Sequence, residues 1–238
     1  MVHKGPLKAK PHPGRAAGRL LARAIAEAVS VGAKRLLRKQ WTTLRRDLVA
    51  ELSSYLDSAE PRPSLLAQRF LISAEDHRFF SHRGIDPVAI CRAMWRGVVL
   101  RRREGASTIE MQVIRVVSGR FERTLRRKIH ELALATLVSS VIPKEALPGL
   151  YLRIGYYGWR MNGFSGACRR LQLDPRALGP IEAAGLVARL KYPQPRLTDQ
   201  RRWSQIHARA QHILRLYADH RYDGTYGGVV IGPLHETF

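Results

Sequence analysis

The amino-acid sequence predicts a mainly α-helical protein built around one ordinary domain. Three observations lead to this prediction. Apolar residues recur at spacings of three and four along much of the chain, as they do on one face of a helix. Convincing alternation of apolar and polar residues, the mark of a half-buried strand, is absent from the sequence. Of the 238 residues, 45% are hydrophobic, which is enough for a core.

The chain carries a large positive charge, because 41 lysines and arginines oppose 19 acidic residues to give +22. Such a charge attracts nucleic acid, anionic lipid surfaces or phosphorylated substrates. The two cysteines, Cys91 and Cys168, make no disulfide framework or metal-binding pattern, and we expect small buried or half-buried side chains. No stretch approaches the roughly 20 uncharged apolar residues of a membrane span, and no secretory signal is found.

The first 60 residues divide into a tail and a helical region. Residues 1–16 are rich in Pro, Gly and Lys, which predicts a disordered basic tail. Residues 17–60 are expected to form basic amphipathic helices. From Leu37 to Tyr55 the apolar face either packs on the domain or lies on an anionic membrane, and packing is the favoured interpretation. For Leu20–Leu37 membrane binding is favoured, since that segment has no obvious partner.

The main domain is expected to span residues 61–220, followed by a Gly-rich tail over 221–238. After a proline break, Ser64 can cap a helix over 65–74, which places two adjacent carboxylates at its C-terminal end. Asp86-Pro87 is typical of an N-cap followed by a first-turn proline. It predicts a helix to about Leu100 with three side chains facing inward: Cys91, Trp95 and Val98.

The second half of the domain contains further helix patterns. Ser107 and Glu110 fit a capping box, with serine as N-cap and glutamate at the third helical position. A long helix is expected over 121–140, and others over 148–156, 180–190 and 198–220.

The stretch from Leu71 to Gly84 combines carboxylates with aromatic and basic residues. A carboxylate walled by aromatic rings loses solvation, so it can serve as a general acid or base. The spacing resembles the first motif of the family 51 peptidoglycan glycosyltransferases, E-D-x-x-F-x-x-H-x-G, at Glu75, Asp76, Phe79, His82 and Gly84.

The resemblance continues in order along the chain, from about Leu65 to Leu216. Gly105-Ala106-Ser107-Thr108-Ile109 is similar to the second motif, with Gln112 on its last position and Arg115 three residues later. Arg127-Lys128 and Glu131 are similar to the third motif, with Arg123 one turn earlier. Lys144 and Tyr151 belong to the similarity with the fourth motif, and Arg201-Arg202 with Ile213-Leu214 gives a loose version of the fifth.

The third motif can also be interpreted without the family. On one helix Arg123, Arg127 and Glu131 would lie one above another. Such a row is often only a surface ion-pair ladder worth about 0.3–0.5 kcal/mol per pair. The alternative is a cationic stripe that binds a pyrophosphate. The order of motifs favours the stripe.

The family resemblance implies a lysozyme-like α-helical fold with a smaller, mobile, membrane-facing lobe, which the chain from roughly Ile85 to Arg120 would supply. The implied reaction is polymerisation of lipid II, a disaccharide-peptide joined through pyrophosphate to a polyprenyl chain, onto a nascent glycan strand. Glu75 would be the base and Glu131 the second acid. Arg115, Arg123, Arg127 and Lys128 would bind the leaving pyrophosphate. The sugar and phosphate subsites would contain Ser107, Thr108 and Gln112.

The same resemblance assigns supporting roles to Asp76, Phe79, His82 and Gly84. It also implies that the protein acts at the outer, periplasmic face of the bacterial cytoplasmic membrane. No protein metal site is expected, although a divalent cation, Mg²⁺ or Mn²⁺, can bridge the substrate pyrophosphate. Nucleic acid is not an expected partner, and the sequence leaves the oligomeric state open.

Three positions depart from the family pattern. Glu110-Met111 replaces a neutral Thr-Gln pair, and Glu110→Thr or Glu110→Gln is expected to leave activity equal or higher. Pro148-Gly149 is expected to interrupt a helix, and Arg153 replaces an asparagine. Two other functions stay open: a lysozyme-like glycan hydrolase, and a non-catalytic protein that binds glycan, membrane or nucleic acid. The arginines favour a transferase, because glycoside hydrolysis has no pyrophosphate to neutralise.

Overall fold

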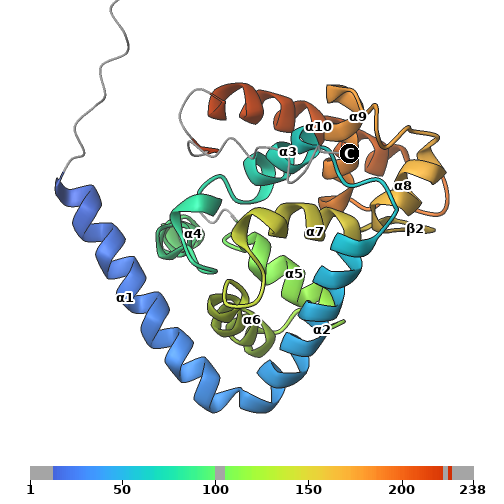
Figure 1. The fold of residues 1–238 in the computed structure, drawn as a ribbon. Coiled ribbons are helices and arrows are strands. Elements are labelled where there is room, and N and C mark those ends of the chain that lie inside the picture. The colour runs from blue at the N-terminus through green and yellow to red at the C-terminus, as the bar shows by residue number, and fades with distance from the viewer. Residues whose placement is uncertain (1–12, 100–104, 222–224, 227–238) are drawn as a thin grey trace, which may run out of the picture.

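A computed structural model describes residues 13–99, 105–221 and 225–226. The described part is mainly α-helical, as predicted, and consistent with a lysozyme-like domain (Figure 1). The α-helices are α1 Pro13–Leu36, α2 Arg38–Asp57, α3 Leu65–Glu75, α4 Pro87–Val99, α5 Ile109–Val117, α6 Leu125–Val138, α7 Leu147–Ile154, α8 Gly163–Leu171, α9 Pro180–Lys191 and α10 Gln200–His220. Two 3₁₀ turns, η1 Phe79–Ser81 and η2 Lys144–Ala146, and an antiparallel pair, β1 Tyr156–Gly158 and β2 Met161–Asn162, complete the described elements.

Helices α1 and α2 meet at Leu37 and form a V along one side of the molecule (Figure 1). Residues 1–12 of the predicted tail lie outside the described residues, and α1 begins within that tail, at Pro13. Two small side chains of α1, Ala26 and Ala33, are buried, and the helix packs along α6. The segment for which membrane binding was favoured therefore has a partner in the fold.

The amphipathic helix predicted over Leu37–Tyr55 packs on the domain, so the favoured interpretation is confirmed. Leu44, Leu48 and Tyr55 of α2 are buried, and α2 contacts α5 and α7. Burying a leucine side chain stabilises a fold by about 1.5–3 kcal/mol. Burial of the two leucines therefore contributes to holding α2 against the core. None of the helices in the described part of the chain has the length and apolar composition required to cross a membrane.

The main core lies between α3, α5, α6, α7, α9 and α10. Helix α3 starts as predicted, because the Ser64 hydroxyl accepts a hydrogen bond from the Ala67 N–H at 3.2 Å. Its last turn carries Glu75 out of the core. A smaller second core lies beneath the β1–β2 hairpin and α8, and includes Tyr157, Met161 and Phe164.

Helix α4 differs from its prediction. Asp86 caps it as expected, accepting hydrogen bonds from the N–H groups of Val88 and Ala89. The face predicted to point inward is open, since Cys91 is exposed and Trp95 is 60% exposed. The side chain of Val98, and Leu100, lie outside the described residues. Helical periodicity places these side chains on one face but cannot show whether another element covers it.

The small lobe expected over Ile85–Arg120 also comprises fewer residues than predicted. Only α4 stands apart, whereas α5 lies in the main core with Ile109, Met111 and Ile114 buried. Pro148 causes no interruption, because it occupies the first turn of α7, where its missing N–H has no helical partner to lose.

Candidate active-site cleft

The C-terminal end of α3 opens into a cleft of about 830 Å³ that contains Glu75. Helices α4, α5, α7, α9 and α10 contribute to its walls. Its described basic and histidine side chains are Arg92, Arg96, Arg115, Arg209, Lys191, His77, His212 and His220. Among the described residues Glu75 is the single acid that lines this cleft. The cleft is therefore suited to an anionic ligand beside one carboxylate.

Two donors hold the carboxylate of Glu75. Gln112 Nε2 donates to Oε2 at 3.0 Å, and Arg209 Nη2 donates to Oε1 at 2.8 Å. The side chain is 16% exposed, so one edge still reaches the cleft. The sequence suggested a wall of aromatic rings, but Phe79 is fully buried in the core. Polar donors on α5 and α10 surround this acid instead.

Buried polar atoms without partners also belong to this cleft. Gln112 Oε1 and Arg209 Nε have no hydrogen bond within the described part of the chain. Leaving such groups unsatisfied costs about 1–3 kcal/mol each, which a polar ligand or water would recover. Tyr151 forms part of the same wall, and its pKa is raised by burial and then by the negative charge of Glu75.

Arg115 links the cleft to Glu131. Its Nε and Nη2 atoms donate to Oε1 and Oε2 of Glu131, each at 3.0 Å. This bidentate hydrogen bonding raises the pKa of Arg115 against the opposing effect of burial. Arg127 also donates to Glu131. Glu131 is 3% exposed and lies behind Arg115, beside a separate cavity of about 310 Å³, and it does not face Glu75 across one groove.

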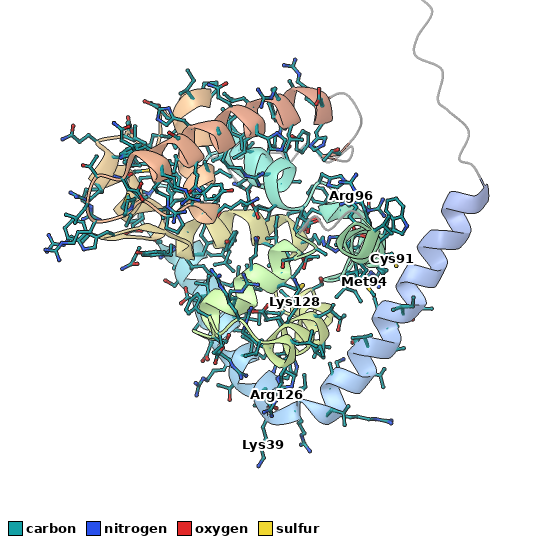
Figure 2. All side chains as sticks on the ribbon, turned by 180° about the vertical axis from the view of Figure 1, so that it is seen from behind. Lys39, Cys91, Met94, Arg96, Arg126 and Lys128 are labelled. Carbon is teal, nitrogen blue, oxygen red and sulfur yellow. The ribbon has the colours of Figure 1, made fainter. Side chains whose placement is uncertain are left out.

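The remaining residues of the predicted pyrophosphate site are spread out. Arg123 precedes the first residue of α6, so it does not stack above Arg127 on one helix, and it is exposed. Lys128 is exposed and its Nζ lies 3.4 Å from the hydroxyl of Ser107, which lines the cleft. Figure 2 shows Lys128 on α6 in the view from behind.

Thr108 has a structural position that the sequence did not predict. It is the N-cap of α5 in place of Ser107, accepting a hydrogen bond from the Met111 N–H, and it is 2% exposed. Its hydroxyl donates to the carbonyl of Gly84 at 2.7 Å. The predicted capping box of Ser107 and Glu110 does not form. Thr108 thus ties α5 to the loop after Glu75 and does not line the cleft.

The loop after Glu75 is fixed by buried contacts. Asp76 accepts a hydrogen bond from His82 Nε2 at 3.0 Å and one from the Ile109 N–H at 3.3 Å. Gly84 has a φ of 87°, and a Cβ there would lie 2.0 Å from the carbonyl oxygen of Ala135. Only glycine fits this approach of the loop to α6.

Glu110 is fully buried and forms an ion pair with Lys144, at 2.5 Å between Oε1 and Nζ. Lys144 also donates to the carbonyl of His82 at 2.8 Å and lies over the ring of Phe79. Glu110 therefore adds no charge to the cleft and does not cap its own helix. The negative charge that Glu110 adds to the family pattern is therefore paired with Lys144 inside the core.

The side chains of the described residues do not fit a metal that bridges the substrate. The cleft offers one carboxylate among its described residues, and that group is bound to Gln112 and Arg209. Ligand atoms of Asp76, His82 and Glu110 lie within 4.8 Å of one another, but this cluster is buried and the Lys144 ammonium already contacts it.

Sequence analysis missed most of the cations in the cleft. Arg209 lies in the middle of α10, whereas the fifth-motif comparison pointed to Arg201 and Arg202 in the first turn of that helix. Arg92 and Arg96 of α4 and the stacked pair His77–His220, with ring centroids 5.6 Å apart, were also missed. The pKa of His77 is lowered, first by burial and then by Arg92. Only the tertiary fold brings α4, α10 and the loop after α3 together.

Comparison of the sequence with known proteins identifies relatives of this chain. The profile of the Transglycosylase family matches residues 46–218. The chain is 33% identical over 163 residues to penicillin-binding protein 1A of Rickettsia felis, covering 66% of the chain and 20% of that protein. It is 41% identical over 101 residues to penicillin-binding protein 1A of Escherichia coli, covering 41% of the chain and 12% of that protein.

A third relative is matched over a larger share of its own length. The biosynthetic peptidoglycan transglycosylase of Rhodospirillum centenum is 35% identical over 163 residues, covering 68% of this chain and 69% of that protein. The chain spans about one fifth of the penicillin-binding protein 1A of Rickettsia felis. The family profile covers well over half of the 238 residues. This chain belongs to the Transglycosylase family.

Proposed function

We propose that the protein is a peptidoglycan glycosyltransferase that polymerises lipid II into glycan strands. The observation that carries this proposal is the position of Glu75, the one carboxylate among the described residues of a cleft whose lining includes four arginines and a lysine. A donor with a pyrophosphate leaving group requires positive charge on one side and a base on the other. A glycan hydrolase would have no use for this surplus of cations.

In the proposed reaction the 4-hydroxyl of the acceptor sugar attacks the anomeric carbon of the donor. A new C–O bond forms as the bond to the pyrophosphate breaks, with inversion, and polyprenyl pyrophosphate leaves. Glu75 takes the hydroxyl proton. Gln112 and Arg209 each bind one of its oxygens, so the carboxylate is held in one orientation before the substrate arrives.

Arg115 is the central cation for the leaving group. Glu131 binds it through two hydrogen bonds and so fixes the direction of its guanidinium, while 29% of the Arg115 side chain remains exposed toward ligand. Arg127 acts on Glu131 from the other side. In this proposal Glu131 is a positioning residue behind Arg115, and Lys128 with Ser107 lies at the rim.

Helix α4 is the proposed membrane-facing element. Its exposed apolar side chains include Val88, Met94, Trp95 and Val99, and the last turn contains Arg96. Figure 2 shows Cys91, Met94 and Arg96 on this helix, at the side of the molecule where α1 runs. An apolar face with adjacent cations suits an anionic membrane surface. The proposed location is the outer face of the cytoplasmic membrane.

The proposal is tested with purified protein, lipid II and detergent, by separating products on a gel that resolves glycan polymer. We expect polymer and release of polyprenyl pyrophosphate. Isolated peptidoglycan is the second substrate, and we expect no cleavage products from it. Cleavage of that substrate without polymer from lipid II would favour a hydrolase and contradict the proposal.

A further inference from the structure

Three arginines surround one tryptophan at the β1–β2 hairpin, and none of these four residues lines the cleft that contains Glu75. The guanidinium carbons of Arg160, Arg170 and Arg196 lie 4.6, 5.0 and 5.6 Å from the ring centroid of Trp159. All three arginines are exposed and Trp159 is half-buried. We call these four residues the Trp159 patch. They come from the hairpin turn, α8 and the α9–α10 loop, so the fold assembles the patch from three segments.

The base of the patch is fixed by backbone contacts. The Trp159 N–H donates to the carbonyl of Gln194 at 2.9 Å, and the Gln194 N–H donates to the carbonyl of Tyr157 at 2.9 Å. A Cβ on Gly158 would lie 2.4 Å from the Gln194 oxygen, so only glycine allows this approach. Tyr157 also belongs to the second core beneath the hairpin. The tryptophan is therefore held in one place.

The patch has three positive charges and no acidic counterpart. None of the three arginines forms an ion pair with a described residue, and no hydrogen bond of their guanidinium groups is found among those residues. Arg160 has a φ of 57°, a conformation that costs free energy for a residue with a side chain. A guanidinium stacked on a ring still presents N–H groups at its edge, in the geometry that binds carboxylates and phosphates.

The position of the patch selects among anionic partners. The hairpin and α8 lie at the opposite end of the molecule from α4, the proposed membrane-facing element (Figure 1). Lys191 lines the cleft, and Arg196 follows it by five residues, which limits their Cα separation to about 18 Å. A polymer leaving the cleft on the side of α9 can therefore reach the patch, while a membrane beneath α4 lies at the other end.

We propose that the Trp159 patch binds carboxylates on the peptide substituents of the glycan strand. This inference rests on the proposed function, because it is the disaccharide-peptide substrate that gives the strand a peptide, and hence at least one carboxylate, on each repeat. The patch would bind the strand outside the catalytic cleft. Trp159 has its ring occupied by arginines, so its role is to orient them, not to stack on sugar.

The experiment measures binding of the full-length protein to soluble, uncrosslinked glycan strands that carry peptides. The variant is Arg160→Gln/Arg170→Gln/Arg196→Gln. The matched control, Arg38→Gln/Arg45→Gln/Arg126→Gln, removes the same charge from exposed positions on α2 and α6. Figure 2 shows Arg126 well away from the hairpin end. We expect the patch variant to bind at least about tenfold more weakly and the control less than about twofold.

A second probe tests the chemistry of the ligand. Strands whose carboxylates have been converted to primary amides should bind the wild-type protein as weakly as native strands bind the patch variant. Equal losses in the patch variant and the control would overturn the inference, since they would show a response to net charge alone. An equal patch-specific loss with duplex DNA or with anionic lipid vesicles would also overturn it, by assigning the patch to a different partner.

The binding measurement needs no turnover, so its failure is separable from failure of the proposed function. A protein that polymerises lipid II but shows no patch-specific binding retains the proposed function and loses this inference. A protein that binds strands through the patch but makes no polymer retains this binding site and loses the proposed catalytic function.

Discussion

The guanidinium of Arg115 meets the carboxylate of Glu131 through two hydrogen bonds of 3.0 Å, and only the arginine of this pair lines the cleft that contains Glu75. The side chain of Glu131 is 4% exposed, against 29% for Arg115. The acid therefore acts on the cleft through the arginine. This relationship changes what substitution of Glu131 should do.

Glu131→Gln is expected to reduce polymerisation at least about tenfold, because Arg115 loses its bidentate partner and its fixed orientation. Removing one member of a buried pair should also lower the free energy of unfolding by about 3–5 kcal/mol. Initial rates on lipid II and urea denaturation measure the two effects. Glu122→Gln is the control, since Glu122 is exposed and pairs only loosely with Arg120 at 3.8 Å. Wild-type rates for Glu131→Gln would show that Arg115 needs no support.

Glu110→Gln is expected to destabilise the protein, because Glu110 forms a buried ion pair with Lys144. The sequence-based expectation of equal or higher activity did not include this ion pair. The change leaves the Lys144 ammonium without its carboxylate in a buried site, which costs about 3–5 kcal/mol. For a chain of this size the thermal midpoint should fall by on the order of 10 °C. The double variant Glu110→Gln/Lys144→Met should recover part of the loss. A midpoint unchanged by Glu110→Gln would mean that the ion pair contributes nothing.

Gly149→Ala is expected to destabilise the contact between α7 and α2. The added Cβ would lie 2.2 Å from the hydroxyl oxygen of Tyr55, and overpacking of this kind costs about 1–3 kcal/mol. Tyr55→Phe removes that oxygen, so the double variant should be more stable than Gly149→Ala alone. Gly166→Ala is the control, because a Cβ there meets nothing within 4 Å. If Tyr55→Phe gives no rescue in urea denaturation, the proposed contact is wrong.

Stability should fall as the pH is lowered below about 6.5, in part because of His77 and His212. Burial lowers the pKa of both from the ordinary 6.5, with nearby arginines adding to the effect. Between the lowered folded values and 6.5, the unfolded chain binds protons that the folded chain does not, so the free energy of unfolding decreases with falling pH. Below the folded values the loss levels off.

Urea denaturation at pH 7.5 and pH 6.0 measures this effect. The double variant His77→Asn/His212→Asn should show a smaller difference between the two pH values than the wild type. His207→Asn provides the matched control, because His207 is an exposed histidine of α10. An undiminished pH difference in the double variant would exclude these two histidines as its source.

The sequence was sufficient for features set by local chemistry. Ser64 and Asp86 cap the helices predicted for them, and the apolar face of α2 is buried as periodicity indicated. Local pattern could not choose between Ser107 and Thr108 as the cap of α5, because both hydroxyls can accept the same kind of hydrogen bond. The helix expected over 148–156 forms as α7, Leu147–Ile154, and Pro148 lies in its first turn, so the interruption expected from the proline does not occur.

Features set by long-range contacts were not predictable from one sequence. Glu110 and Lys144 are 34 residues apart, and Glu75 and Arg209 are 134 apart. Arg153, which replaces the family's asparagine, donates to the carbonyl of Ser54 at 2.8 Å, and only the fold reveals this link between α7 and α2. The residue type at a motif position thus indicated the chemistry of the side chain. Its ion-pair or hydrogen-bond partner depended on the packing of distant segments.

The most direct test of the account compares the initial rate of lipid II polymerisation by the wild-type protein and by Glu75→Gln. Glu145→Gln serves as the control, since Glu145 is an exposed acid of η2. Loss of a general base should reduce the rate by about 100- to 10,000-fold, with folding unchanged by circular dichroism. The control should retain the wild-type rate. A Glu75→Gln protein that polymerises lipid II at the wild-type rate would contradict the assignment of Glu75 as the base.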